Sequence, residues 1–343
     1  MPESLGQYKI LDRIGSGAMG ELMRARDTRA GRTVALRLVA RDISDDPGQR
    51  TEFLADARGV TGLSHPNVAA LYEIGEEQGV LYLACEFVPG QPLASLVTGH
   101  PLNARRAVEF GVQLADALAD AHAAGLVHRD LRSSGIMVTP KDKVKILDFG
   151  LARWSDSGLA RARASRLEAR TEPSELAAVR YMSPEQIVGE DSDERTDLFS
   201  LGVILFEMLT GRPPFTGANS SDVALQIAQA PTPSVRAINH DLPAEVEEIV
   251  RKALSKSLEQ RYESAATMAA ELRSVAAILD VRADVKAEAE EAGTLPSVSE
   301  GGSARGNSPL VWLAAGAVLV GLTWWQRDLA VTLLGRLLSL VSR

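Results

Sequence analysis

The sequence predicts an α+β chain in which a small strand-rich lobe precedes a larger helical lobe. Residues 33–39 and 80–85 are rich in β-formers, and each segment follows a glycine. From about Asn103 onward, apolar residues recur at helical spacing. Residues 197–210 are nearly all apolar and end at Gly211, which is typical of a helix in the middle of a helical lobe. Together these observations predict a bilobal fold.

The remaining elements follow in chain order. A helical segment at about 49–63 interrupts the strands and ends before Ser64-His65-Pro66-Asn67. The first long helix of the second lobe carries an apolar face at 108–122 and ends at Gly125. No internal repeat of the length found in solenoid proteins is present.

Composition excludes several classes of protein. The net charge of −8 disfavours binding to a phosphate backbone, so we expect no nucleic-acid partner. A single cysteine, Cys85, excludes a disulfide framework or a cysteine-built metal site within one chain. The polar N-terminal residues lack a secretory signal, so we expect the N-terminal body to lie in the cytoplasm.

A glycine-rich motif opens the first lobe and admits three interpretations. It comprises Ile14, Gly15, Ser16, Gly17, Ala18, Met19, Gly20, Glu21 and Leu22. The pattern G-x-G-x-x-G opens a dinucleotide-binding unit when a helix follows, and it also occurs in plain hairpin turns. Here the next segment, 34–37, has strand character, which favours a hairpin whose backbone amides approach nucleotide phosphates.

Four further motifs follow in a fixed order. They are His128-Arg129-Asp130-Leu131, Leu147-Asp148-Phe149-Gly150, Tyr181-Met182-Ser183-Pro184-Glu185 and Asp197-Leu198-Phe199-Ser200-Leu201-Gly202. Over residues 8–272 the chain resembles the bacterial branch of the eukaryotic-type (Hanks-type) serine/threonine protein kinases. The resemblance implies a bilobal protein-kinase fold, ATP and Mg²⁺ as ligands, and a protein substrate or signalling partner.

The resemblance also assigns roles to individual residues. Asp130 and Arg132 would be catalytic, and Asp148 would hold Mg²⁺. The nucleotide-binding set would be Ile14, Gly15, Ser16, Gly17, Gly20, Leu22, Ala35, Arg37, Asp56, Glu86, Val88 and Met137. Of these, Leu22, Ala35 and Met137 would enclose adenine, and the backbone from Glu86 to Val88 would hydrogen-bond to it. Cys85 would stand behind the adenine, although the residue type favours a small buried apolar role.

Other matched residues would be structural. Glu185 would pair with Arg261, and Asp197 would anchor the loop that holds His128. A spine of side chains joining the lobes would comprise Val60, Leu71, His128 and Phe149.

The positions that depart from the family pattern are mostly those that would bind phosphate and metal. Arg37 and Asp56 replace a lysine and a glutamate, and we expect them to pair with each other because the longer arginine offsets the shorter aspartate. Gly135 replaces the asparagine that binds a second Mg²⁺, Arg132 replaces a lysine, and Ala178 replaces a threonine. Losing one preorganised charge-stabilising group commonly costs about 2.7–4 kcal/mol, or ~10²–10³ in rate.

Three functions therefore compete. The first is a pseudokinase or very weak kinase that binds ATP and acts through partner binding. The second is an active kinase that transfers the ATP γ-phosphate to protein serine or threonine. The third is an interaction module with an empty nucleotide cleft. In the segment 151–180, Thr171 is a candidate phosphorylation site whose phosphate Arg129 would bind, although the favoured interpretation is a solvated loop that is not modified.

The C-terminal part predicts membrane attachment. Residues 273–309 become acidic and then rich in Gly, Ser and Pro, as in a linker. Residues 310–325 carry no charge and have tryptophans near both ends, so a helix there would span about 24 Å of a ~30 Å hydrocarbon core. A short amphipathic tail, 326–343, follows. We expect a single-pass protein of the cytoplasmic (inner) membrane with the kinase domain in the cytoplasm.

Overall fold

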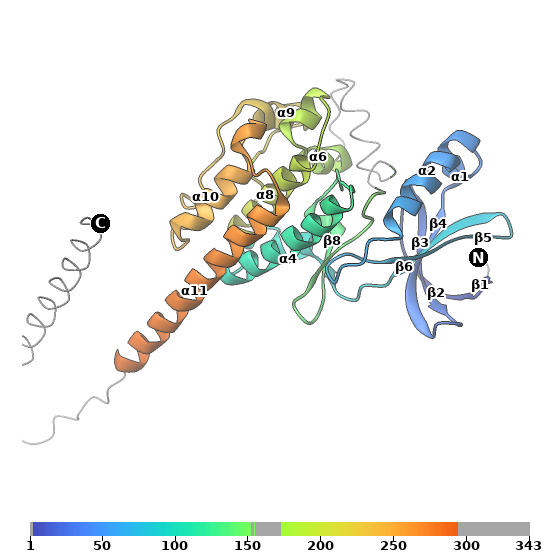
Figure 1. Cartoon of the computed structure of the whole chain (residues 1–343), viewed down its shortest axis with the longest axis horizontal. Helices are drawn as coiled ribbons and strands as arrows, with labels where there is room; N and C mark the ends of the chain where they lie inside the picture. The colour runs from blue at the N-terminus through green and yellow to red at the C-terminus, as the bar shows by residue number, and fades with distance from the viewer. Residues whose placement is uncertain (1–2, 152–153, 155–172, 294–343) are drawn as a thin grey trace, which may run out of the picture. The chain divides into compact units, whose positions relative to one another are not determined.

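The computed structural model describes residues 3–151, 154 and 173–293. The chain divides into two units at Glu288, and the first, Met1–Glu288, contains both lobes. Of the second unit, only the end of one helix is described. Strands dominate one part of the first unit and helices the other (Figure 1).

The first lobe is a six-stranded antiparallel sheet with the strand order β1-β2-β3-β4-β6-β5. Its strands are β1 (Ser4–Leu5), β2 (Tyr8–Gly17), β3 (Gly20–Asp27), β4 (Arg32–Val39), β5 (Leu71–Glu77) and β6 (Val80–Glu86). The two strands predicted from β-forming residues are confirmed as β4 and β6. One face of the sheet buries Met23, Val34 and Leu36 among others. The opposite face packs against a helix.

That helix, α2 (Pro47–Val60), follows the short helix α1 (Arg41–Ser44). The Asp46 carboxylate caps its start by accepting a hydrogen bond from Gln49 N at 2.7 Å. Phe53 and Ala57 are fully buried against the sheet residues Leu81 and Leu83. Because truncating such a buried phenylalanine costs about 3–5 kcal/mol, this contact fixes α2 on the sheet.

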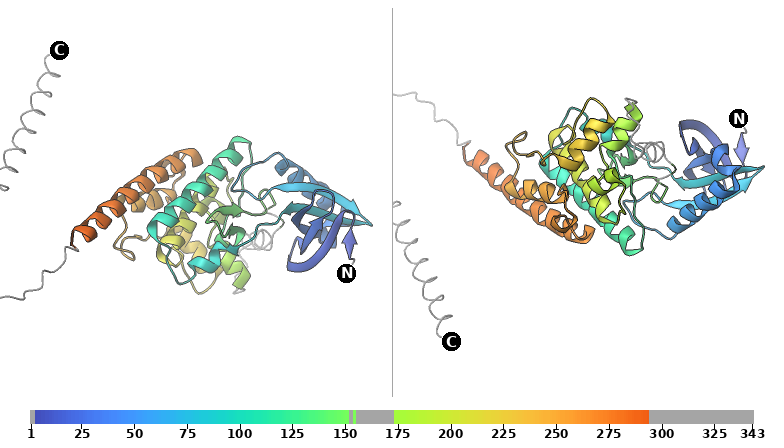
Figure 2. Two further views of the ribbon diagram at one scale, coloured as in Figure 1. Left: turned by 90° about the horizontal axis from the view of Figure 1, so that it is seen from below. Right: turned by 90° about the horizontal axis from the view of Figure 1, so that it is seen from above.

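The second lobe is built around helix α8 (Arg195–Thr210), which is buried from Thr196 to Thr210. Glycines allow its close contacts: a Cβ on Gly202 would lie 2.8 Å from Ala253 Cβ, and one on Gly111 would lie 2.8 Å from Leu205 Cδ2. The helices around it, seen from two sides in Figure 2, are α3 (Leu93–Val97), α4 (Ala104–Ala123), α6 (Pro173–Val179), α7 (Pro184–Val188), α9 (Ser220–Gln229), α10 (Ala244–Ala253) and α11 (Ala265–Gly293). The predicted buried helix in the middle of this lobe is confirmed.

The second lobe also contains a small three-stranded sheet. Its strands are β7 (Gln91–Pro92), β8 (Ile136–Val138) and β9 (Val144–Ile146), in that order. The 3₁₀ turn η1 (Ser133–Gly135) leads directly into β8, and a second 3₁₀ turn, η3 (Leu258–Gln260), precedes α11. Because β8 and β9 pair with each other, the chain segment that leads into β8 lies beside the segment that follows β9.

The last described helix, α11, continues into the segment predicted to be a linker and ends at Gly293. Within the described residues, no helix is both long and apolar enough to cross a membrane. The predicted membrane helix, 310–325, and the tail, 326–343, lie outside the described residues.

Candidate functional site

The glycine-rich motif forms the β2–β3 hairpin. Gly17 pairs with Gly20 across the two-residue turn, and Gly15 pairs with Leu22. Gly20 has a φ of 110°, and a Cβ there would lie 1.9 Å from Leu38 O, so only glycine fits. Because a strand follows the motif, the predicted hairpin is confirmed and the dinucleotide-binding interpretation is wrong, while an approach of the hairpin to nucleotide phosphates stays a prediction.

Strand register brings the predicted nucleotide residues to one face of the sheet. Residues directly opposite each other in antiparallel strands lie on the same face. Leu22 is opposite Arg37, and Ala35 is opposite Cys85. Since Ala35 and Arg37 are two residues apart on β4, all four side chains lie on the face toward the second lobe.

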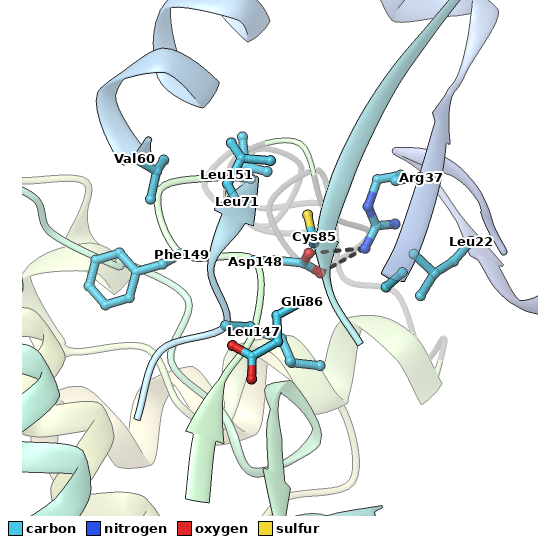
Figure 3. A pocket seen from close by; sticks show the side chains of 12 residues that line it. Leu22, Arg37, Val60, Leu71, Cys85, Glu86, Leu147, Asp148, Phe149 and Leu151 are labelled. Atoms are coloured by element: carbon cyan, nitrogen blue, oxygen red, sulfur yellow. Dashed lines mark hydrogen bonds and ion pairs between the residues drawn. The ribbon is translucent and has the colours of Figure 1, made fainter. Parts of the chain in front are cut away.

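These residues line a cavity of about 90 Å³ (Figure 3). Its complete lining is Leu22, Ala35, Arg37, Val60, Ala69, Leu71, Cys85, Glu86, Leu147, Asp148, Phe149 and Leu151. The predicted residues Val88 and Met137 are not part of this lining; Val88 is buried and Met137 half-buried on β8. Of the predicted loop residues, only Leu22 reaches the cavity, and Ile14 is exposed. Ligand pockets commonly measure about 300–1,000 Å³, so this cavity is small for a nucleotide site.

Arg37 pairs with Asp148 and not with Asp56, so the expected Arg37–Asp56 salt bridge is wrong. Its Nη2 donates to Asp148 Oδ1 at 3.0 Å and to Oδ2 at 2.9 Å. No ion pair joins Arg37 to Asp56, both of which are among the described residues. A guanidinium pairs with the carboxylate that comes nearest, and Asp148 lies beside it in a left-handed backbone conformation with a φ of 51°.

Asp56 instead accepts a hydrogen bond from Trp154. The distance from Trp154 Nε1 to Asp56 Oδ2 is 2.8 Å. The indole packs edge-to-face on Phe53, with ring centroids 5.4 Å apart, in a buried cluster that also contains Met19 of the glycine hairpin. Sequence reasoning missed Trp154. The available signal was a large aromatic residue six positions after Asp148 in a run rich in polar residues.

The catalytic-loop aspartate is held in a defined position. Asp130 is buried, its backbone N–H donates to His128 Nδ1 at 3.2 Å, and Arg132 Nε lies 3.6 Å from Asp130 Oδ2. Asp197 accepts hydrogen bonds from the backbone N–H groups of His128 and Arg129, each at 2.8 Å. The predicted anchoring role of Asp197 is therefore confirmed. These bonds also hold Arg129 at a φ of 64°, a conformation that costs a non-glycine residue about 1 kcal/mol or more.

Gly135 ends the turn η1, where the family has a metal-binding asparagine. A Cβ built there meets only Arg132 Cγ, at 3.7 Å, which is ordinary van der Waals contact. The fold therefore does not require glycine at this position.

A second ion pair that sequence reasoning missed lies at the cavity. Lys145 Nζ donates to Glu86 Oε2 at 2.8 Å and joins β9 of one lobe to β6 of the other. Cys85 lies beside Glu86, and burial raises the pKa of its thiol to about 12. A thiol with that pKa stays protonated and inert, which agrees with a small buried apolar role.

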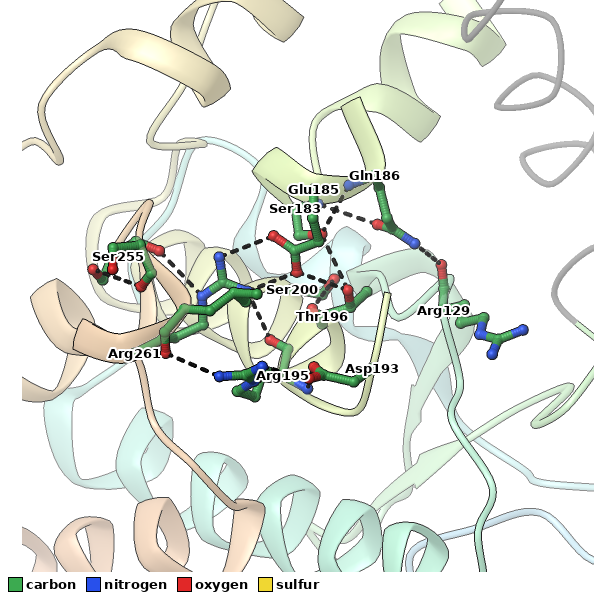
Figure 4. A network of polar contacts seen from close by, with 12 residues as sticks. Arg129, Ser183, Glu185, Gln186, Asp193, Arg195, Thr196, Ser200, Ser255 and Arg261 are labelled. Carbon is green, nitrogen blue, oxygen red and sulfur yellow. Dashed lines mark hydrogen bonds and ion pairs between the residues drawn. The ribbon is translucent and has the colours of Figure 1, made fainter. Parts of the chain in front are cut away.

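Beneath the catalytic loop, Glu185 and Arg261 form a buried pair (Figure 4). Their N–O distances are 2.8 and 3.1 Å, and their side chains are 4% and 0% exposed. Burial by itself would raise the pKa of Glu185, but the hydrogen bonds and charge of Arg261 outweigh it and lower the pKa. This predicted pair is confirmed.

The predicted spine is confirmed for three of its four members. His128 and Phe149 are in edge-to-face contact at 4.9 Å, and Val60 belongs to the same buried cluster. Leu71 packs against the other cluster, beneath the sheet, and lines the cavity.

A further polar cluster, which sequence reasoning missed, lies next to the catalytic loop. Tyr181 Oη donates to both carboxylate oxygens of Glu207 at 2.8 and 2.9 Å and lies 2.7 Å from Ser133 Oγ. Burial raises the pKa of Glu207 to about 7. Ala178 is buried on α6, whereas Thr171 lies outside the described residues.

The sequence comparison decides the family. The profile of the protein kinase domain matches residues 8–272. The chain belongs to the protein kinase family. Its relatives include the serine/threonine-protein kinase PrkC of Bacillus subtilis, 35% identical over 78% of this chain and 40% of the relative. The serine/threonine-protein kinase PknB of Mycobacterium tuberculosis is 36% identical over 78% of this chain and 42% of the relative. The kinase domain thus spans about two-fifths of these relatives' length and places the chain in the bacterial Hanks-type branch.

Solved structures agree on the fold. The crystal structure of the Mycobacterium tuberculosis PknI kinase domain has a TM-score of 0.60 and 22% identity, and it covers 79% of this chain and 97% of that one. The bilobal protein-kinase fold, with a β-rich first lobe and a helical second lobe, is confirmed.

Protein kinases generally use ATP with Mg²⁺, and the residues at the expected metal positions do not fit the ion in this arrangement. Gly135 offers no ligand, and both oxygens of Asp148 accept hydrogen bonds from Arg37. Among the described residues, no group of three or more Asp, Glu, His or Cys side chains gathers as a metal site. Mg²⁺ is usually held by one or two carboxylates together with phosphates and water, and here the expected carboxylate, Asp148, is engaged by Arg37.

Proposed function

We propose that this protein is a membrane-tethered pseudokinase that binds nucleotide, transfers phosphate very weakly or not at all, and acts in signalling through partner binding. The observation that carries the proposal is the Arg37–Asp148 ion pair, at 2.9 Å. It occupies the carboxylate that a working kinase needs for its metal, while Gly135 removes the second ligand.

The residues that would surround the phosphates of a bound nucleotide favour nucleotide binding. The glycine hairpin is formed, Ala35 is small, and Arg37 presents a permanent positive charge to the cavity. The small size of the cavity and the changed phosphate and metal contacts favour weakened affinity.

A working kinase is the second candidate, because the C-terminal half of the catalytic machinery is ordered. Asp130 is buried beside Arg132, and Asp197 holds the backbone of the same loop. These contacts support phosphotransfer by a chain that compensates for Arg37 and Gly135.

Phosphate transfer separates the candidates. Purified full-length protein is incubated with radiolabelled ATP, Mg²⁺ and a general protein acceptor, with Asp130→Asn as the control. The proposal expects incorporation near that of the control. Incorporation comparable to an ordinary kinase, and abolished by Asp130→Asn, would refute the pseudokinase assignment. No nucleotide binding in any condition would instead indicate the empty-cleft interaction module.

The membrane part of the proposal rests on the sequence. We propose a kinase domain at 8–272, a linker at 273–309, a single membrane helix at 310–325 and a short tail at 326–343, with the kinase domain in the cytoplasm at the inner membrane. Full-length protein should resist carbonate extraction, and truncation before Pro309 should release it. Full-length protein in the soluble fraction without detergent would refute the anchor.

A further inference from the structure

Glu86 and Asp148, which line the cavity, and Asp130 of the catalytic loop each have a cationic partner. Glu86 pairs with Lys145 at 2.8 Å, Asp130 with Arg132 at 3.6 Å, and Asp148 with Arg37 at 2.9 Å. In an ordinary kinase the metal ions bind the carboxylate at the position of Asp148 and neutralise both this carboxylate and the nucleotide phosphates. Here Arg37 already neutralises Asp148.

Arg37 also keeps donor capacity for a ligand. Only its Nη2 bonds to Asp148, and its Nε is buried without a hydrogen-bond partner. The residue is 9% exposed and lines the cavity. A buried, unsatisfied donor destabilises the folded state, and arginine cannot relieve this cost by losing its proton. An anionic oxygen that came within hydrogen-bond distance of Arg37 Nε would satisfy this donor.

The same geometry opposes a metal ion. A cation at Asp148 would have to displace Arg37 or lie beside its fixed positive charge. Displacement would leave the buried guanidinium unpaired, which is strongly unfavourable. Gly135 supplies no ligand to offset that cost.

We propose that this cleft binds a nucleoside triphosphate as the metal-free anion, with Arg37 replacing the metal ion as the countercharge of the phosphates while it stays paired with Asp148. The Arg37 Nε donates to a phosphate oxygen, and the glycine hairpin offers backbone N–H groups to the same chain of phosphates. This inference rests on the nucleotide-binding part of the proposed function.

The test compares ATP binding with and without metal. Full-length protein in detergent is titrated with ATP by calorimetry, once in EDTA and once in MgCl₂. We expect ATP to bind at least as tightly in EDTA as in MgCl₂. Binding that requires MgCl₂ would overturn the metal-free site and leave nucleotide binding standing. No binding in either condition would overturn both.

Two substitutions sharpen the result. In EDTA, Arg37→Met should weaken ATP binding by about 10- to 100-fold, the equivalent of one or two charge-assisted hydrogen bonds. Arg32→Met is the matched control, because Arg32 lies on the same strand and pairs with Asp27, yet lies outside the cavity lining. The control should bind ATP like the parent.

Asp148→Asn distinguishes a metal-dependent nucleotide site from the proposed metal-free site most directly. At a metal-dependent site this change removes a ligand and weakens nucleotide binding. At the proposed site it removes a negative charge next to Arg37 and should strengthen ATP binding in EDTA. Weaker binding by Asp148→Asn in EDTA would contradict the proposal.

Discussion

The helical lobe and the sheet side of the cleft differ in whether their polar residues bind the partners expected from the family. In the helical lobe, Glu185 binds Arg261, and Asp197 binds the backbone of the catalytic loop, both as expected from the family. On the sheet side, Arg37 and Asp56 do not meet, and each contacts a residue that follows strand β9. The polar contacts that stabilise the helical lobe are those expected from the family. The residues that would bind phosphate contact partners other than the expected ones.

Burial explains why the two regions behave differently. The Glu185–Arg261 pair is almost completely enclosed, so each partner needs the other. Asp148 is 37% exposed in its pair with Arg37, so water can solvate this carboxylate if its partner changes. The fold therefore tolerates a changed partner of Asp148 better than a changed partner of Glu185.

The largest expected effect comes from breaking the buried pair. Arg261→Met leaves Glu185 charged and unpaired in the interior, which should lower the free energy of unfolding by about 3–5 kcal/mol. Arg251→Met is the control, because Arg251 pairs with Glu248 on the exposed face of α10 and should contribute about 0–1 kcal/mol. Urea denaturation followed by circular dichroism measures both. Equal losses for the two variants would contradict the contrast between the regions.

Restoring the family residues in the cleft should raise phosphotransfer without lowering the stability of the fold. Arg37→Lys, Asp56→Glu and Gly135→Asn together should raise phosphotransfer by roughly 10²-fold or more, because they return the lysine–glutamate pair and a metal ligand. The space at Gly135 accepts a side chain, so stability should change little. The repaired protein should also need Mg²⁺ for ATP binding. A radiolabelled transfer assay that finds no increase would show that the exchanged residues are not what limits the rate.

The Tyr181–Glu207 cluster provides a pH test within the scaffold. Burial raises the pKa of Glu207 from an ordinary 4.5 to about 7, so between these values the folded state binds more protons than the unfolded state. The free energy of unfolding should therefore fall as the pH rises from 4.5 to 7, by about 2 kcal/mol from this group. Glu207→Gln should flatten this part of the profile measured by denaturant titration. An unchanged slope would exclude Glu207 as its source.

The smallest effect is expected at the exchanged partner of Asp56. Trp154→Phe keeps the ring on Phe53 but removes the indole donor, which should cost about 0.5–1.5 kcal/mol. A double-mutant cycle with Asp56→Asn isolates the contact from other changes. A coupling energy of zero in unfolding measurements would show that the hydrogen bond does not hold α2 in place.

Much of the kinase domain could be predicted from residue patterns alone. The β-rich segments, the buried helix α8 and the ordered motifs predicted the two lobes, and they located Asp130, Asp148 and Glu185 in the chain. These features depend on periodicity and on spacing along the sequence, which are local properties. The glycine hairpin followed from one neighbouring strand.

Only the tertiary structure decided which charges meet. The sequence contains Arg37, Asp56 and Asp148, and side-chain length alone favoured the first pair. The outcome depended on the left-handed backbone at Asp148 and on Trp154, a residue 98 positions from Asp56, entering the space beneath α2. Ion pairs depend on distances of a few ångströms between segments far apart in the chain, and no local pattern encodes such distances.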